Sequence, residues 1–264
     1  MPEVHPEFGR LMTAEEYARE WEENARHFEK HGFYTMPLER LGKPKAVLEI
    51  GCGSGRSTLA LAKKRHRVVA MEINATAARS AHDFLSVNGI RTQLTDALPS
   101  AHEVEKGAAQ VIIVTGNILA DDALASGTDW HPDAVICWFI GAQLDVIAAF
   151  FGKPTIKLTS DDVRMYRLSL QGKCYEVGRK MLHGNGLVQI ADRMRLASWQ
   201  DKDQARDELV QTQSELAGPD FQISRSSTFL SRVSGGFDGS SIQYLTQSPD
   251  SNVRVVTSVI ATKR

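Results

Sequence analysis

The sequence predicts an α/β fold in which a mostly parallel β-sheet carries helices on both faces. Short apolar runs at 46–50, 67–71 and 111–114 each lead into a glycine-containing or polar segment. The first two runs are followed by stretches of helical character, at 56–65 and 75–87. This alternation is typical of βαβ units, whose crossover helices place successive strands parallel. The length of 264 residues, 42% of them hydrophobic, allows one large domain with a substantial core.

The region before the first strand is predicted to be helical. Thr13 and Glu16 have the spacing of a capping box at a helix start. Apolar side chains then recur three or four residues apart on one helical face, at Tyr17, Trp21, Ala25 and Phe28. We therefore expect residues 1–45 to form a helical lid and linker, and residues 46–264 to form the main domain. A polar stretch around 89–110 is expected to be an insertion that holds a short strand or hairpin and a helical turn.

The second half of the chain continues the pattern. Ser160 is a favourable N-cap, and the two aspartates after it suit the first turn of a helix. The remaining predicted elements are a short helix at 121–125, strands at 133–140 and 187–191, a helix that follows Ser160 and includes 163–181, a helix at 203–216, strands at 221–230 and 253–262, and a Gly/Ser-rich turn at 234–241.

Composition excludes several classes of protein. Lys plus Arg number 31 and Asp plus Glu number 32, so a net charge of −1 does not favour a nucleic-acid partner. No run approaches 18 apolar residues, and the first residues lack the features of a signal peptide, so a cytoplasmic protein that does not span a membrane is expected. The three cysteines, Cys52, Cys137 and Cys174, are widely spaced and predict neither a disulfide framework nor a metal site.

The first chemically informative segment is Gly51-Cys-Gly-Ser-Gly55, at a strand-to-helix junction. Glycines permit a sharp turn and close approach of a ligand, and the helix start offers unpaired N–H groups. Glu72 ends the next strand, 21 residues after Gly51, where an acid binds ribose hydroxyls in dinucleotide-type folds. An NAD-type loop would need glycine at Arg56, and no lysine of a phosphate-binding P-loop follows.

The run Val47-Leu-Glu-Ile-Gly-Cys-Gly-Ser-Gly-Arg56 resembles motif I of class I S-adenosylmethionine-dependent methyltransferases. The resemblance implies a Rossmann-like, seven-stranded, mostly parallel sheet with an antiparallel last strand. It also implies S-adenosyl-L-methionine as cofactor and S-adenosyl-L-homocysteine as product. The residues it suggests for cofactor binding are Glu49, Gly51, Cys52, Gly53, Gly55, Glu72, Ile73, Asn117, Ile118 and Trp138, with Tyr17 and Trp21 from the lid.

Two choices stay open at this point. The family's adenine-binding acid corresponds to Asn117 in Gly116-Asn117-Ile118, or to Asp96 in an alternative alignment. Asn117 is preferred because its strand is apolar and a further strand follows at a typical interval. Tyr17 and Trp21 either cover the cofactor or form only the packing face of their helix.

The function that follows from the resemblance is methyl transfer by in-line displacement to a small-molecule acceptor. Two alternatives are a catalytically silent, methyltransferase-like binding or scaffold protein and a nucleic-acid methyltransferase. The sequence contains no Asn/Asp-Pro-Pro-aromatic signature, and no proline precedes Cys137, which argues against base methylation. A catalytic base is not assigned, and the oligomeric state is left open. The candidates for acceptor contact are Gln143, Asp145 and Tyr166, followed by Tyr34 and Arg164.

Overall fold

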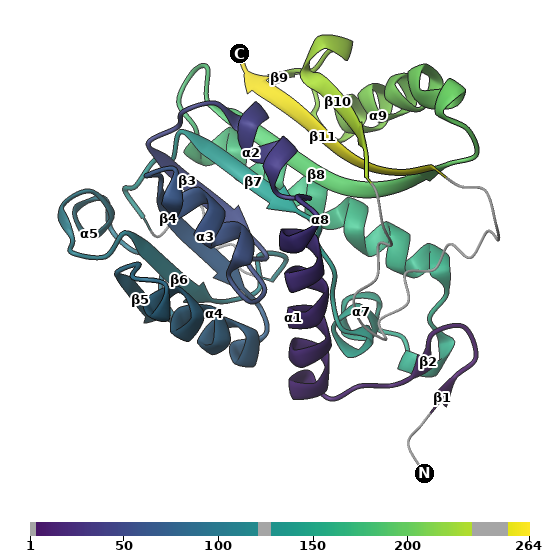
Figure 1. Ribbon diagram of the computed structural model, residues 1–264, viewed down its shortest axis with the longest axis horizontal. Helices are drawn as coiled ribbons and strands as arrows, with labels where there is room; N and C mark the ends of the chain where they lie inside the picture. The colour runs from purple at the N-terminus through teal and green to yellow at the C-terminus, as the bar shows by residue number, and fades with distance from the viewer. Residues whose placement is uncertain (1–3, 121–127, 234–252) are drawn as a thin grey trace.

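A single mixed β-sheet runs through the computed structural model, which describes residues 4–120, 128–233 and 253–264 (Figure 1). Within those residues the sheet has nine strands, in the order β10-β11-β8-β7-β3-β4-β6-β5, and β9 pairs with β11. The strands are β3 (Ala46–Ile50), β4 (Arg67–Glu72), β5 (Thr92–Thr95), β6 (Val111–Thr115), β7 (Ala134–Trp138), β8 (Leu187–Leu196), β9 (Phe221–Gln222), β10 (Thr228–Arg232) and β11 (Val253–Lys263). From β5 across to β8 all neighbours are parallel, whereas β11 is antiparallel to its partners β8, β9 and β10.

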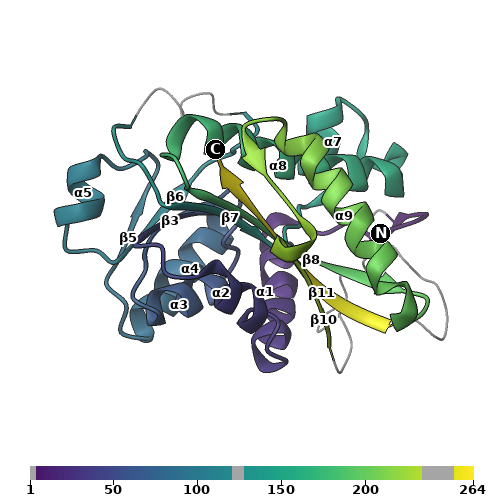
Figure 2. The ribbon, with the colours of Figure 1, turned by 90° about the horizontal axis from the view of Figure 1, so that it is seen from above.

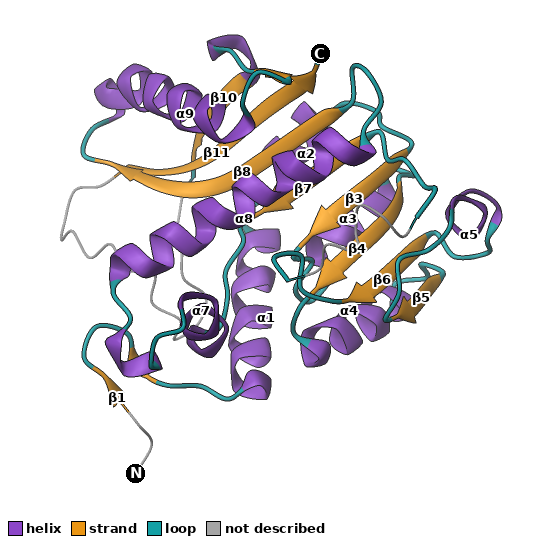
Figure 3. Cartoon of the chain, turned by 180° about the vertical axis from the view of Figure 1, so that it is seen from behind, coloured by secondary structure: helices purple, strands orange, loops and turns teal. Residues whose placement is uncertain are grey.

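Helices cover both faces of the sheet, as Figure 2 shows from above. One face carries α1 (Ala14–Lys30), α2 (Thr35–Leu41), α3 (Arg56–Lys63) and α4 (Ala75–Val87). The other carries α5 (Ala101–Lys106), α7 (Leu144–Phe151), α8 (Ser160–Met181) and α9 (Lys202–Ala217), with α8 and α9 prominent from behind (Figure 3). The smaller elements are the hairpin strands β1 (Val4–His5) and β2 (Gly9–Arg10) and the 3₁₀ turns η1 (Thr155–Lys157), η2 (Trp199–Asp201) and η3 (Arg225–Ser227). No helix among the described residues is long and apolar enough to cross a membrane.

The carboxyl ends of the parallel strands lie at one edge of the sheet, because the last residues of neighbouring strands are paired with each other. Ile50 of β3 lies opposite Met71 of β4, and Met71 lies opposite Val114 of β6. The residues that follow β3, β4, β6 and β7 therefore gather along one edge of the sheet. In open α/β sheets this carboxyl edge is where ligands bind.

The predicted fold class is confirmed, but the sheet has more strands than the seven expected. One extra strand, β5, lies with α5 in the 89–110 segment. The other arises because the predicted single strand 221–230 was wrong: it is divided into β9 and β10 by η3. The serines cause the division, since the Ser227 hydroxyl accepts a hydrogen bond from the Ser224 N–H (3.0 Å) and the Thr228 hydroxyl donates one to the Ser224 carbonyl (2.9 Å).

Helices α2 and α7 and the hairpin of β1 and β2 were not predicted from the sequence. Helix α2 contains Pro37, which suggests a linker, but proline is tolerated in a first turn, where its missing N–H has no helical partner. Helix α7 is apolar on most sides and lacks a polar face, so its periodicity is hidden; Gly152, at φ +61°, ends it. The β1–β2 hairpin is only two residues long on each side. The helix expected at 121–125 and the turn expected at 234–241 lie outside the described residues.

Candidate functional site

The glycine loop between β3 and α3 is a tight turn made by left-handed backbone. Gly51, Gly53 and Gly55 have φ angles of +76°, +52° and +83°. The N–H groups of Gly51 and Cys52 both donate to the carbonyl of Met71 on the neighbouring strand, at 2.8 and 3.1 Å. Because side chains with a Cβ are strained at such angles, the spacing of the three glycines is dictated by the backbone itself.

Two of these glycines also allow side chains from other segments to lie directly against the loop. A Cβ on Gly51 would lie 2.0 Å from Cδ1 of Ile140, and a Cβ on Gly53 would lie 2.7 Å from Nε1 of Trp21. Gly55 has a different neighbour, since its Cβ would lie 3.2 Å from the Cα of Ala81 on α4. Gly51 and Gly53 therefore form a cradle over which Ile140 and Trp21 lie, whereas Gly55 lets α3 pack closely against α4.

Glu72 ends β4 beside this cradle and is only 9% exposed. One carboxylate oxygen accepts a hydrogen bond from the N–H of Gly53 (2.8 Å) and the other from the N–H of Asn74 (2.9 Å). Burial raises the pKa of Glu72, while the backbone donors Asn74, Gly53 and Ile73 act in the opposite direction. A carboxylate has about four lone-pair sites, so these three backbone donors leave room for a hydrogen bond from a ligand.

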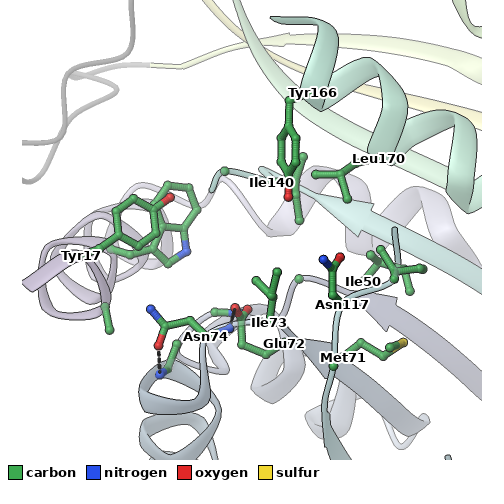
Figure 4. Close-up of a pocket in the computed structure, with 18 residues that line it drawn as sticks. Tyr17, Ile50, Met71, Glu72, Ile73, Asn74, Asn117, Ile140, Tyr166 and Leu170 are labelled. Carbon is green, nitrogen blue, oxygen red and sulfur yellow. Dashed lines mark hydrogen bonds between the residues drawn. The ribbon is translucent and has the colours of Figure 1, made fainter. Parts of the chain in front are cut away.

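A cavity opens above Glu72 along the carboxyl edge (Figure 4). It contains about 630 Å³ of empty space, a figure that includes open solvent. Its lining includes eight of the twelve residues predicted to bind cofactor, namely Tyr17, Trp21, Gly51, Gly53, Glu72, Ile73, Asn117 and Ile118. The structure thus brings together residues from three strand ends and the lid helix.

The other four predicted residues lie outside the lining. Glu49 is buried beneath the loop and accepts hydrogen bonds from Ser57 (2.5 Å) and Thr58 (2.6 Å) of α3. Burial raises the pKa of Glu49 to about 7, against the effect of those two hydroxyl donors. Cys52 is buried and burial also raises its pKa, so it is an inert thiol. Gly55 serves helix packing, as described above.

Trp138 is the fourth, and its surroundings are those of a core residue. Its indole N–H donates to Oε1 of Gln189 on β8 (3.1 Å). The amide of Gln189, which is 0% exposed, in turn donates to the carbonyl of Pro37 and to the hydroxyl of Ser258, at 2.8 Å each. Trp138 therefore belongs to a buried polar network that joins the sheet to α2.

The position of Asn117 separates it from the alternative, Asp96. Asn117 follows β6, which pairs directly with β4, and its amide points into the cavity (Figure 4). Its Oδ1 accepts a hydrogen bond from the N–H of Leu119 (3.0 Å) and retains one further lone pair. Asp96 follows β5 at the outer edge of the sheet and is not part of the lining.

Helix α1 lies across the cavity and is tied to the domain near its start. The side chain of Asn74 donates to the carbonyl of Ala14 (3.0 Å), and the side chain of Gln143 donates to the carbonyl of Met12 (2.7 Å). Tyr17 and Trp21 are stacked, with ring centroids 6.2 Å apart, and both lie against Gly141 after β7. Of the two interpretations of Tyr17 and Trp21, this geometry places them at the cavity rather than only in the core.

Among the acceptor candidates, Tyr166 alone lines the cavity. It is 2% exposed, and its hydroxyl points into the cavity beside Ile140 (Figure 4). Burial and the charge of Glu72 raise the pKa of Tyr166 to about 12, so the phenol is neutral near pH 7 and can donate a hydrogen bond. The other side chains have partners elsewhere: Gln143 with Met12 and Asp145, Asp145 with Thr155, Arg164 with Asp161, and Tyr34 in contact with the rings of Phe28 and Phe139.

Sequence reasoning did not single out several residues that line the cavity. Ile140 and Gly141 follow β7, and Asn74 caps α4 immediately after Glu72. Their positions after strand ends were a usable signal for all three. Leu170 belongs to α8, and nothing local in the sequence indicates that α8 reaches the carboxyl edge. The described residues contain no group of three or more His, Cys, Asp or Glu side chains placed to hold a metal ion.

Comparison with known families agrees with this geometry. Residues 47–127 match the sequence model of a methyltransferase domain, and this segment contains the glycine loop, Glu72 and Asn117. The match covers less than half of the chain, and it shows that this segment is similar to methyltransferase domains. A search among curated proteins gives no match to the chain.

Several solved structures are similar to this chain in overall layout. N-methyltransferase NodS from Bradyrhizobium japonicum, in complex with S-adenosyl-L-homocysteine, is 13% identical over 90% of each chain, with a TM-score of 0.45. A TehB-like SAM-dependent methyltransferase from Corynebacterium glutamicum is 14% identical over 95% of this chain and 98% of its own, with a TM-score of 0.45. TrmN from Thermus thermophilus is 12% identical over 87% of this chain, with a TM-score of 0.48, and this chain spans 48% of it.

Proposed function

We propose that this protein transfers a methyl group from S-adenosylmethionine to a small-molecule acceptor that binds between the lid helix and Tyr166. The observation that carries the proposal is that Gly51, Gly53, Glu72 and Asn117 line one cavity from three adjacent strand ends. The donors and acceptors present are those that an adenosyl thioether needs. When bound, S-adenosylmethionine supplies a methyl carbon already activated by a sulfonium, so positioning by the protein provides much of the rate.

Glu72 would accept a hydrogen bond from the ribose hydroxyls with the lone pair that its backbone donors Gly53, Asn74 and Ile73 leave free. Asn117 is placed to accept one from the adenine amine through Oδ1, with Ile73 and Ile118 as apolar walls. An amide lacks the charge that strengthens a hydrogen bond to a carboxylate, so the contact of Asn117 contributes less than an aspartate would. Glu72 is only 9% exposed, and this low exposure strengthens its polar contacts.

Tyr166 and Tyr17 are the polar groups on the acceptor side of the cavity. Because the pKa of Tyr166 is about 12, its hydroxyl orients the acceptor by hydrogen bonding and does not remove a proton near pH 7. The lid helix on one side of the cavity and the net charge of −1 favour a small molecule over a nucleic acid.

The first test is calorimetric binding of S-adenosyl-L-homocysteine to the wild type and to Glu72→Gln. The substitution keeps the side-chain shape but removes the charge and one accepting oxygen. We expect a loss of about 1.5–3 kcal/mol, the scale of hydrogen bonds to charged groups, or roughly a 10- to 150-fold higher Kd. Glu103→Gln is the control, because Glu103 makes its contacts in the exposed capping box of α5. Equal affinity in wild type and Glu72→Gln would refute the assignment of Glu72.

The second test separates the candidate activities. The protein is incubated with S-adenosylmethionine labelled in the methyl group and, in parallel, with a metabolite extract, total RNA or DNA. Label in low-molecular-weight products supports the proposal. Label in RNA or DNA would replace the acceptor with a nucleic acid, and binding with no transfer to any pool would support a methyltransferase-like binding protein.

A further inference from the structure

Arg56 occupies an unusual place in the structure. It is the first residue of α3, directly after the glycine loop, where the positive end of the helix dipole disfavours a cation. Its side chain is nevertheless only 10% exposed. The guanidinium leaves the loop and reaches the lid helix α1, which precedes it by more than 25 residues in the chain. The electrostatics of the helix start therefore do not explain an arginine at this position, whereas its contact with α1 does.

The contact joins Arg56 to two glutamates on α1. Nη2 of Arg56 lies 2.6 Å from Oε1 of Glu22, and Nε donates to the same oxygen at 3.2 Å. Nη1 of Arg56 bonds the carboxylate of Glu29. Glu22 and Glu29 are two helical turns apart and so share one face of α1. Phe84 of α4 lies under the guanidinium, whose carbon is 4.5 Å from the ring centroid.

This ion-pair cluster is adjacent to the residues that close the cavity. Trp21 precedes Glu22, and its indole nitrogen lies over Gly53, two residues before Gly55 and three before Arg56. The start of α1 is fixed separately, by the bond from Asn74 to Ala14. With the start held by Asn74 and the middle by Arg56, the height of α1 above the glycine loop is determined at two points on either side of Trp21.

We propose that Arg56 is a positioning residue for cofactor binding. Its ion pairs with Glu22 and Glu29 hold α1 at the height at which Tyr17 and Trp21 close over the glycine loop. Loosening the pairs lets α1 lift, so that the cofactor is released faster and bound less tightly. This inference rests on the proposed function, since it assumes that the cavity is the cofactor site.

The structure provides a matched control. Arg26 also donates to Oε1 of Glu22, at 3.3 Å, but it lies on α1 itself and is 65% exposed, so it cannot tie α1 to α3. The experiment compares Arg56→Gln, Glu22→Gln, the double variant and Arg26→Gln. For each, the Kd of S-adenosyl-L-homocysteine is measured by calorimetry, its release rate by competition, and the free energy of unfolding by urea titration.

We expect Arg56→Gln to raise both the Kd and the release rate by about tenfold, in the range of typical coupling between linked sites. Glu22→Gln should act in the same direction. The double variant should be little worse than Arg56→Gln, because both substitutions break the same contact between Arg56 and Glu22. Arg26→Gln should bind like the wild type. Arg56→Lys keeps the charge without the planar fork and should recover part of the affinity, which a loss of folding alone would not explain.

Two results would overturn the inference. One is an unchanged Kd in Arg56→Gln; the other is a double variant whose losses are the sum of the single losses. If Arg56→Gln does not fold, the comparison of Arg56→Lys and Glu22→Gln with the wild type decides in the same way. Failure of the proposed function looks different, because the wild type itself would then not bind S-adenosyl-L-homocysteine.

Discussion

The buried carboxyl of Glu49 makes the stability of this protein depend on pH in a way that one substitution can isolate. Glu49 is 1% exposed, and its pKa is raised from 4.5 to about 7, chiefly by burial. Below pH 4.5 both the folded and the unfolded chain hold the proton, so this group costs nothing. Above pH 4.5 the unfolded chain releases the proton while the folded chain keeps it. Folding is therefore penalised increasingly until the pH passes about 7.

The size of the effect follows from the shift. A shift from 4.5 to about 7 corresponds to about 3 kcal/mol at high pH, since each pKa unit is worth roughly 1.4 kcal/mol. Most of this penalty, about 2–3 kcal/mol, develops between pH 5 and pH 8. Glu49→Gln has no proton to lose, so it removes this dependence while keeping the shape of the side chain. Its effect on the hydrogen bonds from Ser57 and Thr58 is the same at both pH values.

The assay is urea unfolding of the wild type and Glu49→Gln at pH 5 and pH 8. The difference in unfolding free energy between the two proteins is taken at each pH, so that contributions from all other groups cancel. We expect the variant to gain about 2–3 kcal/mol relative to the wild type on going from pH 5 to pH 8. A difference that stays constant within about 0.5 kcal/mol, the usual scatter of such additivity comparisons, would show that Glu49 is ionised in the folded protein.

Two further predictions concern the glycine loop and the acceptor side. Gly55→Ala should lower the free energy of unfolding by about 2–4 kcal/mol, because it combines the cost of a left-handed alanine with crowding against Ala81. Gly89 has a φ of +77° and no atom within 4 Å of the position that a Cβ would occupy, so Gly89→Ala should cost only about 1–2 kcal/mol. Urea titration of both variants separates the cost of the backbone angle from the cost of crowding. An equal loss in the two variants would contradict the packing role of Gly55. Tyr166→Phe should leave the Kd of S-adenosyl-L-homocysteine within about twofold of the wild type but lower kcat/KM for the acceptor by roughly tenfold, the loss of one hydrogen bond. An unchanged kcat/KM, measured once an acceptor is identified, would remove Tyr166 from the acceptor site.

The parts of the structure that follow local rules were predictable from the sequence. The glycine loop was one, because left-handed backbone at Gly51, Gly53 and Gly55 leaves few other residue types possible. The parallel strands were another, because short apolar runs between helices have few other arrangements. The capping box of α1 was found at Thr13 and Glu16, as the hydrogen bonds between them show.

Side-chain direction was less predictable, because it depends on the pleat of each strand. Successive residues of a strand point to opposite faces of the sheet. In β3, Leu48 and Ile50 join the cluster of buried side chains that includes α8, while Val47 joins the opposite one. Glu49 shares the face of Val47 and so meets α3 rather than the cavity. The sequence motif includes Glu49, but only the register of the strand shows that it supports the loop from below.

The choice between Asn117 and Asp96 depended on spatial order rather than on chain order. Along the chain β5 precedes β6, so Asp96 comes first after Glu72. In the sheet, however, β6 lies between β4 and β5. Neighbouring strands are about 5 Å apart, so the end of β6 is one such step from Glu72 and the end of β5 is about 10 Å away. A side chain that is to reach a ligand held by Glu72 must therefore come from β6, whichever residue type stands there. The adenine contact of Asn117 stays a prediction, but the sheet order explains why an amide can stand at this position while an available carboxylate lies too far out.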